Sequence, residues 1–134
     1  GTYDFSFSGL KTAVLRLTRQ FEAQGQAIPA ADVAAAFQRV VVNVLVEKTL
    51  RAADEYGATE VLLAGGVAAN ALLRERIAAQ SIIPVRYPAI WLCTDNAAMI
   101  GAAGHFAWEI GRRSGWDLDV VPGLPLVAER LLDA

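Results

Sequence analysis

The fold of this chain is decided by the stretch Glu60-Val-Leu-Leu-Ala-Gly-Gly-Val-Ala-Ala-Asn70. Val61 to Leu63 form a short apolar run typical of a strand, and the two glycines after it remove the Cβ atoms that would keep a ligand away from the backbone. Residues Ala68 to Ala79 then indicate a helix, whose free N–H groups and positive dipole end would face the space over the glycines. The stretch predicts a site for an anion or a nucleotide, although a plain tight connection between a strand and a helix has the same pattern.

The next segment extends this stretch into an α/β fold. A second strand is expected from about Ile83 to Tyr87, with Pro84 near its start, and one helix separates it from the first strand. Two strands joined by one crossover helix form a right-handed βαβ unit with parallel strands. The sequence therefore predicts a small parallel β core with flanking helices, and so small a sheet is expected to be part of a larger one.

Two helices are expected before the first strand. One runs from about Leu10 to Ala23 with Ser8 as its N-cap, and the residues from Tyr3 to Phe7 before it are either a short strand or a buried loop. The other helix runs from Asp32, its N-cap, to about residue 56, where Gly57 stops it. A short final helix is expected after residue 125.

A second candidate site residue, Asp95, precedes a small-residue helix expected from about Ala97 to Arg113. Asp95 follows the carboxyl end of the second strand, and ligand sites of α/β sheets gather at that edge. Because the glycines follow the first strand at the same edge, Asn70 and Asp95 could converge on one pocket. The alternative is that Thr94 or Asp95 only caps the helix.

Composition limits the classes of function. The chain has 134 residues, enough for a single domain, and 54% of them are hydrophobic against 19% charged. The net charge of −2 gives no indication of a nucleic-acid or membrane partner. No stretch approaches the roughly 18 apolar residues that a membrane span needs. The mean hydropathy of +0.35 is high for a small protein, so an apolar face is expected to meet another protein surface.

The single cysteine and the single histidine exclude an internal disulfide and a closed zinc site made of these residue types. Cys93 is interpreted as a small buried apolar residue, and His105 as a packing or hydrogen-bonding residue. No export signal is present, so we expect a cytoplasmic protein. The first residue is Gly1 and not methionine, and we therefore expect a piece of a longer protein.

Three blocks of sequence carry a family resemblance. They are Asp4-Phe-Ser-Phe-Ser-Gly-Leu-Lys-Thr12, then Ala64-Gly-Gly-Val-Ala-Ala-Asn70 followed by Leu73-Arg74, and Cys93-Thr-Asp-Asn-Ala-Ala-Met-Ile100. In order and spacing they resemble the signature blocks of the tRNA N6-adenosine threonylcarbamoyltransferase family (TsaD), formerly called O-sialoglycoprotein endopeptidase or glycoprotease. The resemblance covers nearly the whole chain, which would correspond to the C-terminal part of such a protein.

This resemblance implies a partial actin-like fold of the ASKHA, ribonuclease H-like kind, whose two halves close over a nucleotide and a metal ion. Residues 1–134 would form a single domain of the second half. The implied reaction transfers the threonylcarbamoyl group from threonylcarbamoyl-adenylate to N6 of adenosine 37 in tRNA, which is the t6A modification. The implied partners are tRNA, the N-terminal part of the same chain and the accessory subunits of the t6A-synthesis complex, with no membrane.

The resemblance also implies roles for four residues. Asn70 would contact the substrate nucleotide, Gly65 and Gly66 would let the backbone approach the adenosine, and Asp95 would be a ligand of a divalent metal ion, iron or zinc. The family's other ligands are two histidines in an H-x-x-x-H motif, which residues 1–134 lack. One carboxylate is only one of the roughly four to six ligands that a metal site needs. We therefore expect this chain to be inactive alone, and no catalytic residue or general base is assigned.

Three other functions stay open at this point. A non-catalytic scaffold paralogue of the same fold would lack the histidine pair in its full-length chain. A metalloprotease, suggested by the older family name, would need a metal-bound water and a general base, and no H-E-x-x-H motif is present. A sugar-kinase-like ATPase would be equally well served by the glycine turn, but the first and third blocks argue against it.

Overall fold

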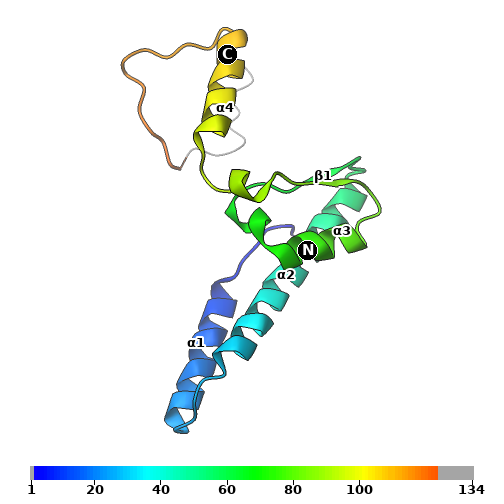
Figure 1. The fold of residues 1–134 in the computed structure, drawn as a ribbon, viewed down its shortest axis with the longest axis vertical. Coiled ribbons are helices and arrows are strands. Elements are labelled where there is room, and N and C mark those ends of the chain that lie inside the picture. The colour runs from blue at the N-terminus through cyan, green and yellow to red at the C-terminus, as the bar shows by residue number, and fades with distance from the viewer. Residues whose placement is uncertain (1, 124–134) are drawn as a thin grey trace. The chain divides into compact units, whose positions relative to one another are not determined.

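A computed structural model describes residues 2–123 of the chain (Figure 1). Two helices precede the first strand: α1 (Ser8–Ala23) and α2 (Ala30–Glu55). The remaining elements, in chain order, are β1 (Val61–Leu62), the 3-10 helix η1 (Gly66–Ala69), α3 (Ala71–Gln80), β2 (Val85–Arg86), the 3-10 helix η2 (Ile90–Leu92) and α4 (Ala97–Glu109).

The chain divides into two compact units, one ending at Asp95 and the other beginning at Asn96, and each is described by itself. A single domain over residues 1–134 stays a prediction. The helix expected after residue 125 lies outside the described residues. No helix within residues 2–123 is both long enough and apolar enough to cross a membrane.

The two strands of the first unit confirm the predicted parallel βαβ arrangement. Val61 pairs with Val85 and Leu62 with Arg86, and α3 is the crossover helix between the strands. The Val61 N–H donates to the Pro84 carbonyl at 2.9 Å, and the Leu63 N–H donates to the Arg86 carbonyl at 2.9 Å. Both strands are shorter than the segments expected from the sequence. The fold class is α/β with a two-stranded parallel sheet.

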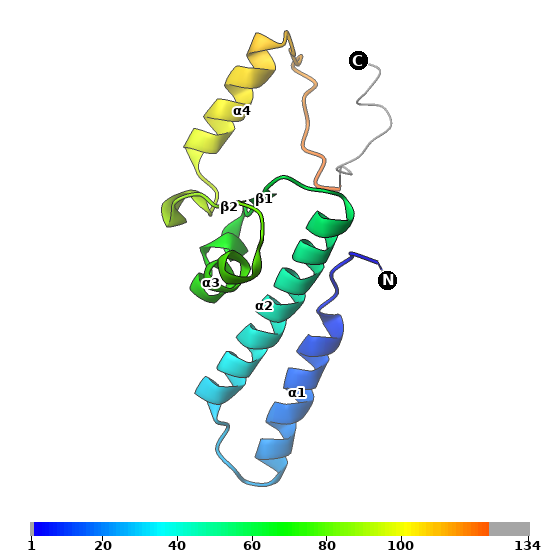
Figure 2. The ribbon, with the colours of Figure 1, turned by 90° about the vertical axis from the view of Figure 1, so that its right-hand side faces the viewer.

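The core of this unit lies between α2, α3 and β1. It is formed by apolar side chains that are at most 7% exposed: Val42, Val46, Val61, Leu73 and Ile77. The valine-rich part of α2 favours a strand locally, but it is helical as predicted, because its inward-facing residues pack on α3 and the sheet. Figures 1 and 2 show α1 running alongside α2, and α1 has no buried residue.

The helix caps differ from the sequence-based expectations. Ser8 is the first residue of α1 and not its N-cap, a position taken by Phe7 without a side-chain hydrogen bond. Asp32 lies in the first turn of α2, which begins directly after Pro29. Pro29 takes the N-cap position with φ −74° and ψ 74°, and an acidic residue in the first turn is favoured by the helix dipole without capping. Gly57 stops α2 as predicted, with a φ of +60°.

The second unit contains α4, which ends at Glu109 and not near residue 113 as expected. Gly111 ends the helix with a φ of +79°, and its N–H donates to the Trp108 carbonyl at 3.0 Å. The Arg112 N–H donates to the Ala107 carbonyl at 2.9 Å, which completes a Schellman motif. Within the described part of this unit α4 has no buried residue, and His105 is exposed.

Candidate functional site

The glycine turn after β1 uses its two glycines differently. Gly65 has φ 83° and ψ 175°, a backbone conformation that is open essentially to glycine alone. Gly66 begins η1 and has no such requirement. A Cβ atom added to either glycine would meet no other atom within 4 Å. The space over both residues is therefore open, as the sequence-based interpretation requires for a ligand that approaches the backbone.

The continuous helix expected from Ala68 to Ala79 is wrong. η1 ends at Ala69, Asn70 is extended (φ −67°, ψ 119°), and α3 begins at Ala71. The break arises because the Asn70 side chain caps α3, its Oδ1 accepting the Leu73 N–H at 3.0 Å. The 3-10 helix η1, which begins at Gly66, thus lies between Gly65 and the positive end of α3, and one of the first N–H groups of α3 already has a partner.

Asn70 is held from a second side as well. Gln38 Nε2, on α2, donates to the same Oδ1 at 3.2 Å. Asn70 and Gln38 line a cavity of about 370 Å³ together with apolar side chains of α2 and Val67. Since both bonds use the oxygen, and Asn70 Nδ2 makes no hydrogen bond within residues 2–123, the amide nitrogen is the group that Asn70 can offer to a ligand. No local pattern indicates Gln38, which lies 32 residues before Asn70.

The first sequence block meets the second in space. Phe5 lines a cavity of about 160 Å³ together with Leu63, Ala64, Val67 and Ala68, among other residues. Lys48 on α2 fixes this segment, because its Nζ donates to the Asp4 carbonyl at 2.5 Å and lies 5.7 Å from the centre of the Phe5 ring. The segment is neither a strand nor a buried loop, since it is irregular and Phe5 is 48% exposed.

Tyr3 attaches the start of this segment to the end of α2. Its hydroxyl donates to Glu55 Oε2, and its ring makes an edge contact with Tyr56 at 5.9 Å between ring centres. The hydrogen bond to Glu55 raises the pKa of Tyr3 above its ordinary value of 10.0. The N-terminal segment therefore contacts the end of α2 through Tyr3 and lines a cavity with residues of the glycine turn through Phe5.

Arg74, in the second block, connects three segments. Its Nε donates to the Ala68 carbonyl at 2.5 Å, and its Nη2 donates to the Pro88 carbonyl at 2.8 Å and to Cys93 Sγ at 3.1 Å. Its guanidinium carbon lies 4.5 Å from the centre of the Tyr87 ring. Arg74 belongs to the second sequence block, but no role for it was predicted from the sequence. A basic residue in the first turn of a helix, where acidic residues are favoured, was the available signal.

Cys93 and Asp95 belong to the third block. Cys93 is 3% exposed, which confirms its predicted burial, and its thiol contacts the Ala89 carbonyl at 3.6 Å as well as Arg74. Asp95 is exposed and follows two residues later, so its Cα lies within about 7 Å of the Cys93 Cα. The structure thus brings the segment leading to Asp95 to the same edge of the sheet as the residues after the glycines.

Asp95 does not line the cavity that Asn70 lines, so their convergence on one pocket stays a prediction. The alternative role of Thr94 or Asp95 as the cap of the following helix is wrong. Asn96 is the N-cap, and its Oδ1 accepts the Met99 N–H at 2.9 Å. The cap therefore gives no reason for an acidic residue at position 95.

The donor set for a metal ion is incomplete. Within residues 2–123 no group of three or more His, Cys, Asp and Glu side chains is placed to hold a metal ion. Asp95 would be a single oxygen ligand, which alone does not fit the coordination of iron or zinc. We therefore derive no chemical step through a metal from this chain.

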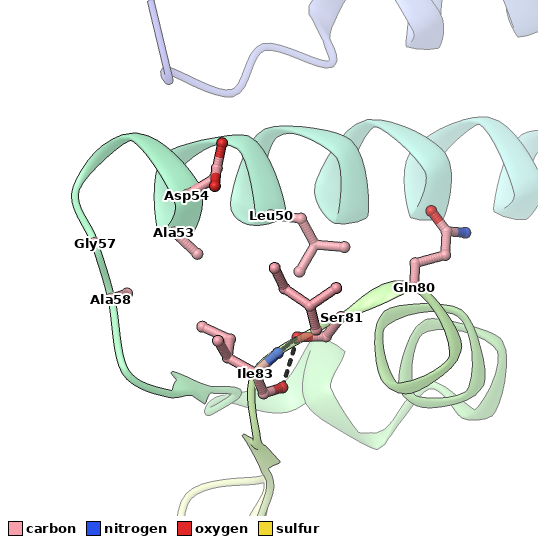
Figure 3. Close-up of a pocket in the computed structure, with 9 residues that line it drawn as sticks. Leu50, Ala53, Asp54, Gly57, Ala58, Gln80, Ser81 and Ile83 are labelled. Carbon is pink, nitrogen blue, oxygen red and sulfur yellow. Dashed lines mark hydrogen bonds between the residues drawn. The ribbon is translucent and has the colours of Figure 1, made fainter.

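A different cavity, of about 280 Å³, lies at the amino end of the sheet (Figure 3). It is lined mainly by aliphatic side chains of α2 and of the loop before β2, including Leu50, Ala53, Ile82 and Ile83. The Ser81 hydroxyl beside it donates to the Ile83 carbonyl at 2.7 Å, a bond drawn in Figure 3. None of the residues predicted from the sequence to form the site lies here.

These features define an α/β protein with a parallel βαβ unit whose open glycine turn and polar contacts gather at the carboxyl end of the sheet. The model of the family "TsaD: tRNA N6-adenosine threonylcarbamoyltransferase" matches residues 1–102. The chain belongs to this family.

Curated relatives carry the same description. A tRNA N6-adenosine threonylcarbamoyltransferase of Thermomicrobium roseum is 52% identical over 152 aligned residues, which cover 99% of this chain and 42% of the relative. Proteins of the same name from Dehalococcoides mccartyi and Bacillus subtilis are 49% and 48% identical and are covered to 38% and 39% of their lengths. The chain thus spans about two fifths of the length of these relatives.

Proposed function

We propose that the protein containing this chain transfers a threonylcarbamoyl group from threonylcarbamoyl-adenylate to N6 of adenosine 37 in tRNA. The observation that carries the proposal is the match to the transferase family over residues 1–102, together with relatives of that name at about half identity. The structure supports it by bringing Phe5 of the first block onto a cavity with Ala64 and Val67 of the second.

We place the chain in the second half of an actin-like, ASKHA-type protein. The parallel βαβ unit, with its glycine turn at the carboxyl end of β1, supports this placement because nucleotides bind at that edge of α/β sheets. The rest of the sheet and the other half of the site would come from the remainder of the full-length protein. The isolated chain is therefore proposed to be inactive.

The adenylate would lie over the glycine turn. With no Cβ atom at Gly65 or Gly66, a nucleotide can come into contact with the backbone, and a Cβ at either position would extend into that open space. Asn70 Nδ2 would donate a hydrogen bond to the nucleotide while its Oδ1 stays bound to Leu73 and Gln38. The transfer needs an adenylate leaving group whose negative charge is stabilised, a task suited to the N–H groups at a helix N-terminus.

Asp95 is proposed as the single metal ligand that this chain contributes, with the other ligands outside it. A cytoplasmic location, tRNA and the accessory subunits of t6A synthesis complete the proposal.

The test uses the full-length protein with the accessory subunits, unmodified tRNA and threonylcarbamoyl-adenylate, and t6A is measured by mass spectrometry of the digested tRNA. We expect t6A at position 37 with the full-length protein and none with residues 1–134 alone. A full-length protein that leaves adenosine 37 unmodified in the presence of the accessory subunits would overturn the proposal and favour a scaffold role.

A further inference from the structure

We propose that Arg74 is a positioning residue that fixes the glycine-turn segment and the segment carrying Asp95 relative to each other. The expected effect of Arg74 on the reaction rests on the proposed function. The contacts of Arg74 themselves do not depend on that function. They join three segments that follow β1, β2 and η2 along the chain.

The first contact fixes the turn. Arg74 Nε donates to the carbonyl of Ala68, which belongs to η1 and is itself 2% exposed. The Ala68 N–H donates to the Gly65 carbonyl at 3.0 Å, so Arg74 and Gly65 both bind the same residue of the turn. A shift of Arg74 would therefore change the position of the backbone beside Gly65 and Gly66.

The other two contacts fix the third block. Arg74 Nη2 donates both to the Pro88 carbonyl, just after β2, and to the buried Sγ of Cys93. The Leu92 N–H donates to the Ala89 carbonyl at 2.9 Å and the Cys93 N–H to the Ile90 carbonyl at 3.1 Å, and these two bonds hold residues 89–93 in a tight 3-10 turn. Holding Cys93 therefore limits where Asp95, two residues later, can lie.

The position of Arg74 on its helix supports a role other than helix stability. α3 has no acidic residue in its first turn, and the charge of Arg74 lies near the positive end of the helix dipole, which is unfavourable. The planar guanidinium compensates with several N–H donors in a fixed geometry and stacks on Tyr87. A lysine ammonium could not reach the Ala68, Pro88 and Cys93 acceptors in the same arrangement.

The test measures how fast Cys93 of the native full-length protein reacts with N-ethylmaleimide, using mass spectrometry of the peptide that contains it. We expect Arg74→Met to speed the reaction by about tenfold or more, because losing charge-assisted bonds favours local opening of residues 89–95. Arg74→Lys should give an intermediate rate. Arg76→Met is the matched control on the same helix and should react at the wild-type rate.

Leu73→Ala separates positioning from general loss of stability, because Leu73 is a core residue beside Arg74. If Leu73→Ala lowers Tm as much as Arg74→Met and speeds Cys93 labelling as much, the proposed role is overturned. Labelling of Arg74→Met at the rate of Arg76→Met would also overturn it.

The reaction provides a second readout. We expect Arg74→Met to lower kcat for t6A formation with little change in KM for tRNA, and wild-type kcat in this variant would contradict a role in the site. If the unsubstituted full-length protein forms no t6A, the proposed function fails, while the labelling comparison still decides the structural role of Arg74.

Discussion

The amino and carboxyl ends of the two-stranded sheet carry different kinds of surface. At the amino end, aliphatic side chains such as Leu50 and Ile83 form a cavity of about 280 Å³ (Figure 3). At the carboxyl end, the groups that stand out are main-chain: the open turn at Gly65 and the carbonyls of Ala68 and Pro88 that Arg74 binds. The cavity at the amino end and the polar contacts around Arg74 thus lie at opposite ends of the strands, and ligand sites of parallel sheets gather at the carboxyl ends.

The largest expected loss of stability comes from a core substitution next to the carboxyl end of the sheet. Ile77 is fully buried and lines the same cavity as Phe5 and Ala64. Ile77→Ala should lower the free energy of unfolding by about 2–5 kcal/mol, because a buried aliphatic group is lost and a hole remains. Urea unfolding of the full-length protein measures this. The matched variant at the amino end is Ile82→Ala, where Ile82 is 94% exposed, and it should change stability by less than about 0.5 kcal/mol.

The next effect separates the two glycines. Gly65→Ala should lower the free energy of unfolding by about 1–3 kcal/mol, because alanine is strained at φ 83° and ψ 175°. Gly66→Ala has the same added atom without the backbone strain, so its Tm should stay close to that of the wild type. If Gly66 faces the adenylate, this second variant should nevertheless show weaker adenylate binding by calorimetry. Equal loss of stability in both variants would contradict the different roles of the two glycines.

A smaller effect distinguishes capping from ligand binding at Asn70. Asn70→Ala should lower the free energy of unfolding by about 0.5–2 kcal/mol, because the Leu73 N–H loses its cap. Asn70→Asp keeps an acceptor for Leu73 and for Gln38 and should retain that stability. It loses the Nδ2 donor, so adenylate binding measured by calorimetry should weaken in both variants. If Asn70→Asp binds the adenylate as tightly as the wild type, Asn70 acts only as the N-cap of α3.

The smallest effect concerns the end of α2 and depends on pH. The hydrogen bond to Glu55 raises the pKa of Tyr3 above 10.0, so it stabilises the fold below pH 10 and is lost as the pH rises through the raised pKa. Tyr3→Phe should lower Tm slightly near neutral pH, and the difference from the wild type should shrink above pH 10. Tyr56→Phe keeps the ring contact and leaves the bond between Tyr3 and Glu55 in place, so it is the matched control. A Tyr3→Phe difference that is constant with pH would argue against the bond.

The parts of the fold that the sequence predicted are those set by local pattern. The strand and glycine pattern around Val61 and Gly65 predicted the parallel unit, and the length of the helix before it outweighed the β-branched residues of α2. Caps were less predictable, since several polar residues near a helix start compete for one position. Asn96 and not Asp95 or Thr94 caps α4, and Pro29 shifts the start of α2 ahead of Asp32.

The candidate site was predictable in its chain segments but not in its contacts. Gly65 could be chosen because a turn residue acts on near neighbours. Asn70 was indicated only as a ligand contact, and its role as the N-cap of α3 is seen in the structure alone. The bond of Gln38 to Asn70 and the bonds of Arg74 to Pro88 and Cys93 depend on how separate segments pack, which no local pattern encodes. The metal role of Asp95 stays a prediction, because its other ligands would lie outside this chain.

The contacts of Arg74 limit which second mutations could restore the function of an Arg74 variant. Two of its three acceptors are peptide carbonyls, at Ala68 and Pro88, and every amino acid carries that group. Substitutions at these two positions cannot abolish the acceptors, and neither can they replace a missing guanidinium. A genetic selection that begins from Arg74→Met should therefore return arginine codons at position 74 and no second-site suppressors at 68 or 88. The contacts therefore survive substitution of the acceptor residues Ala68 and Pro88, but they are lost when the donor, Arg74, is replaced.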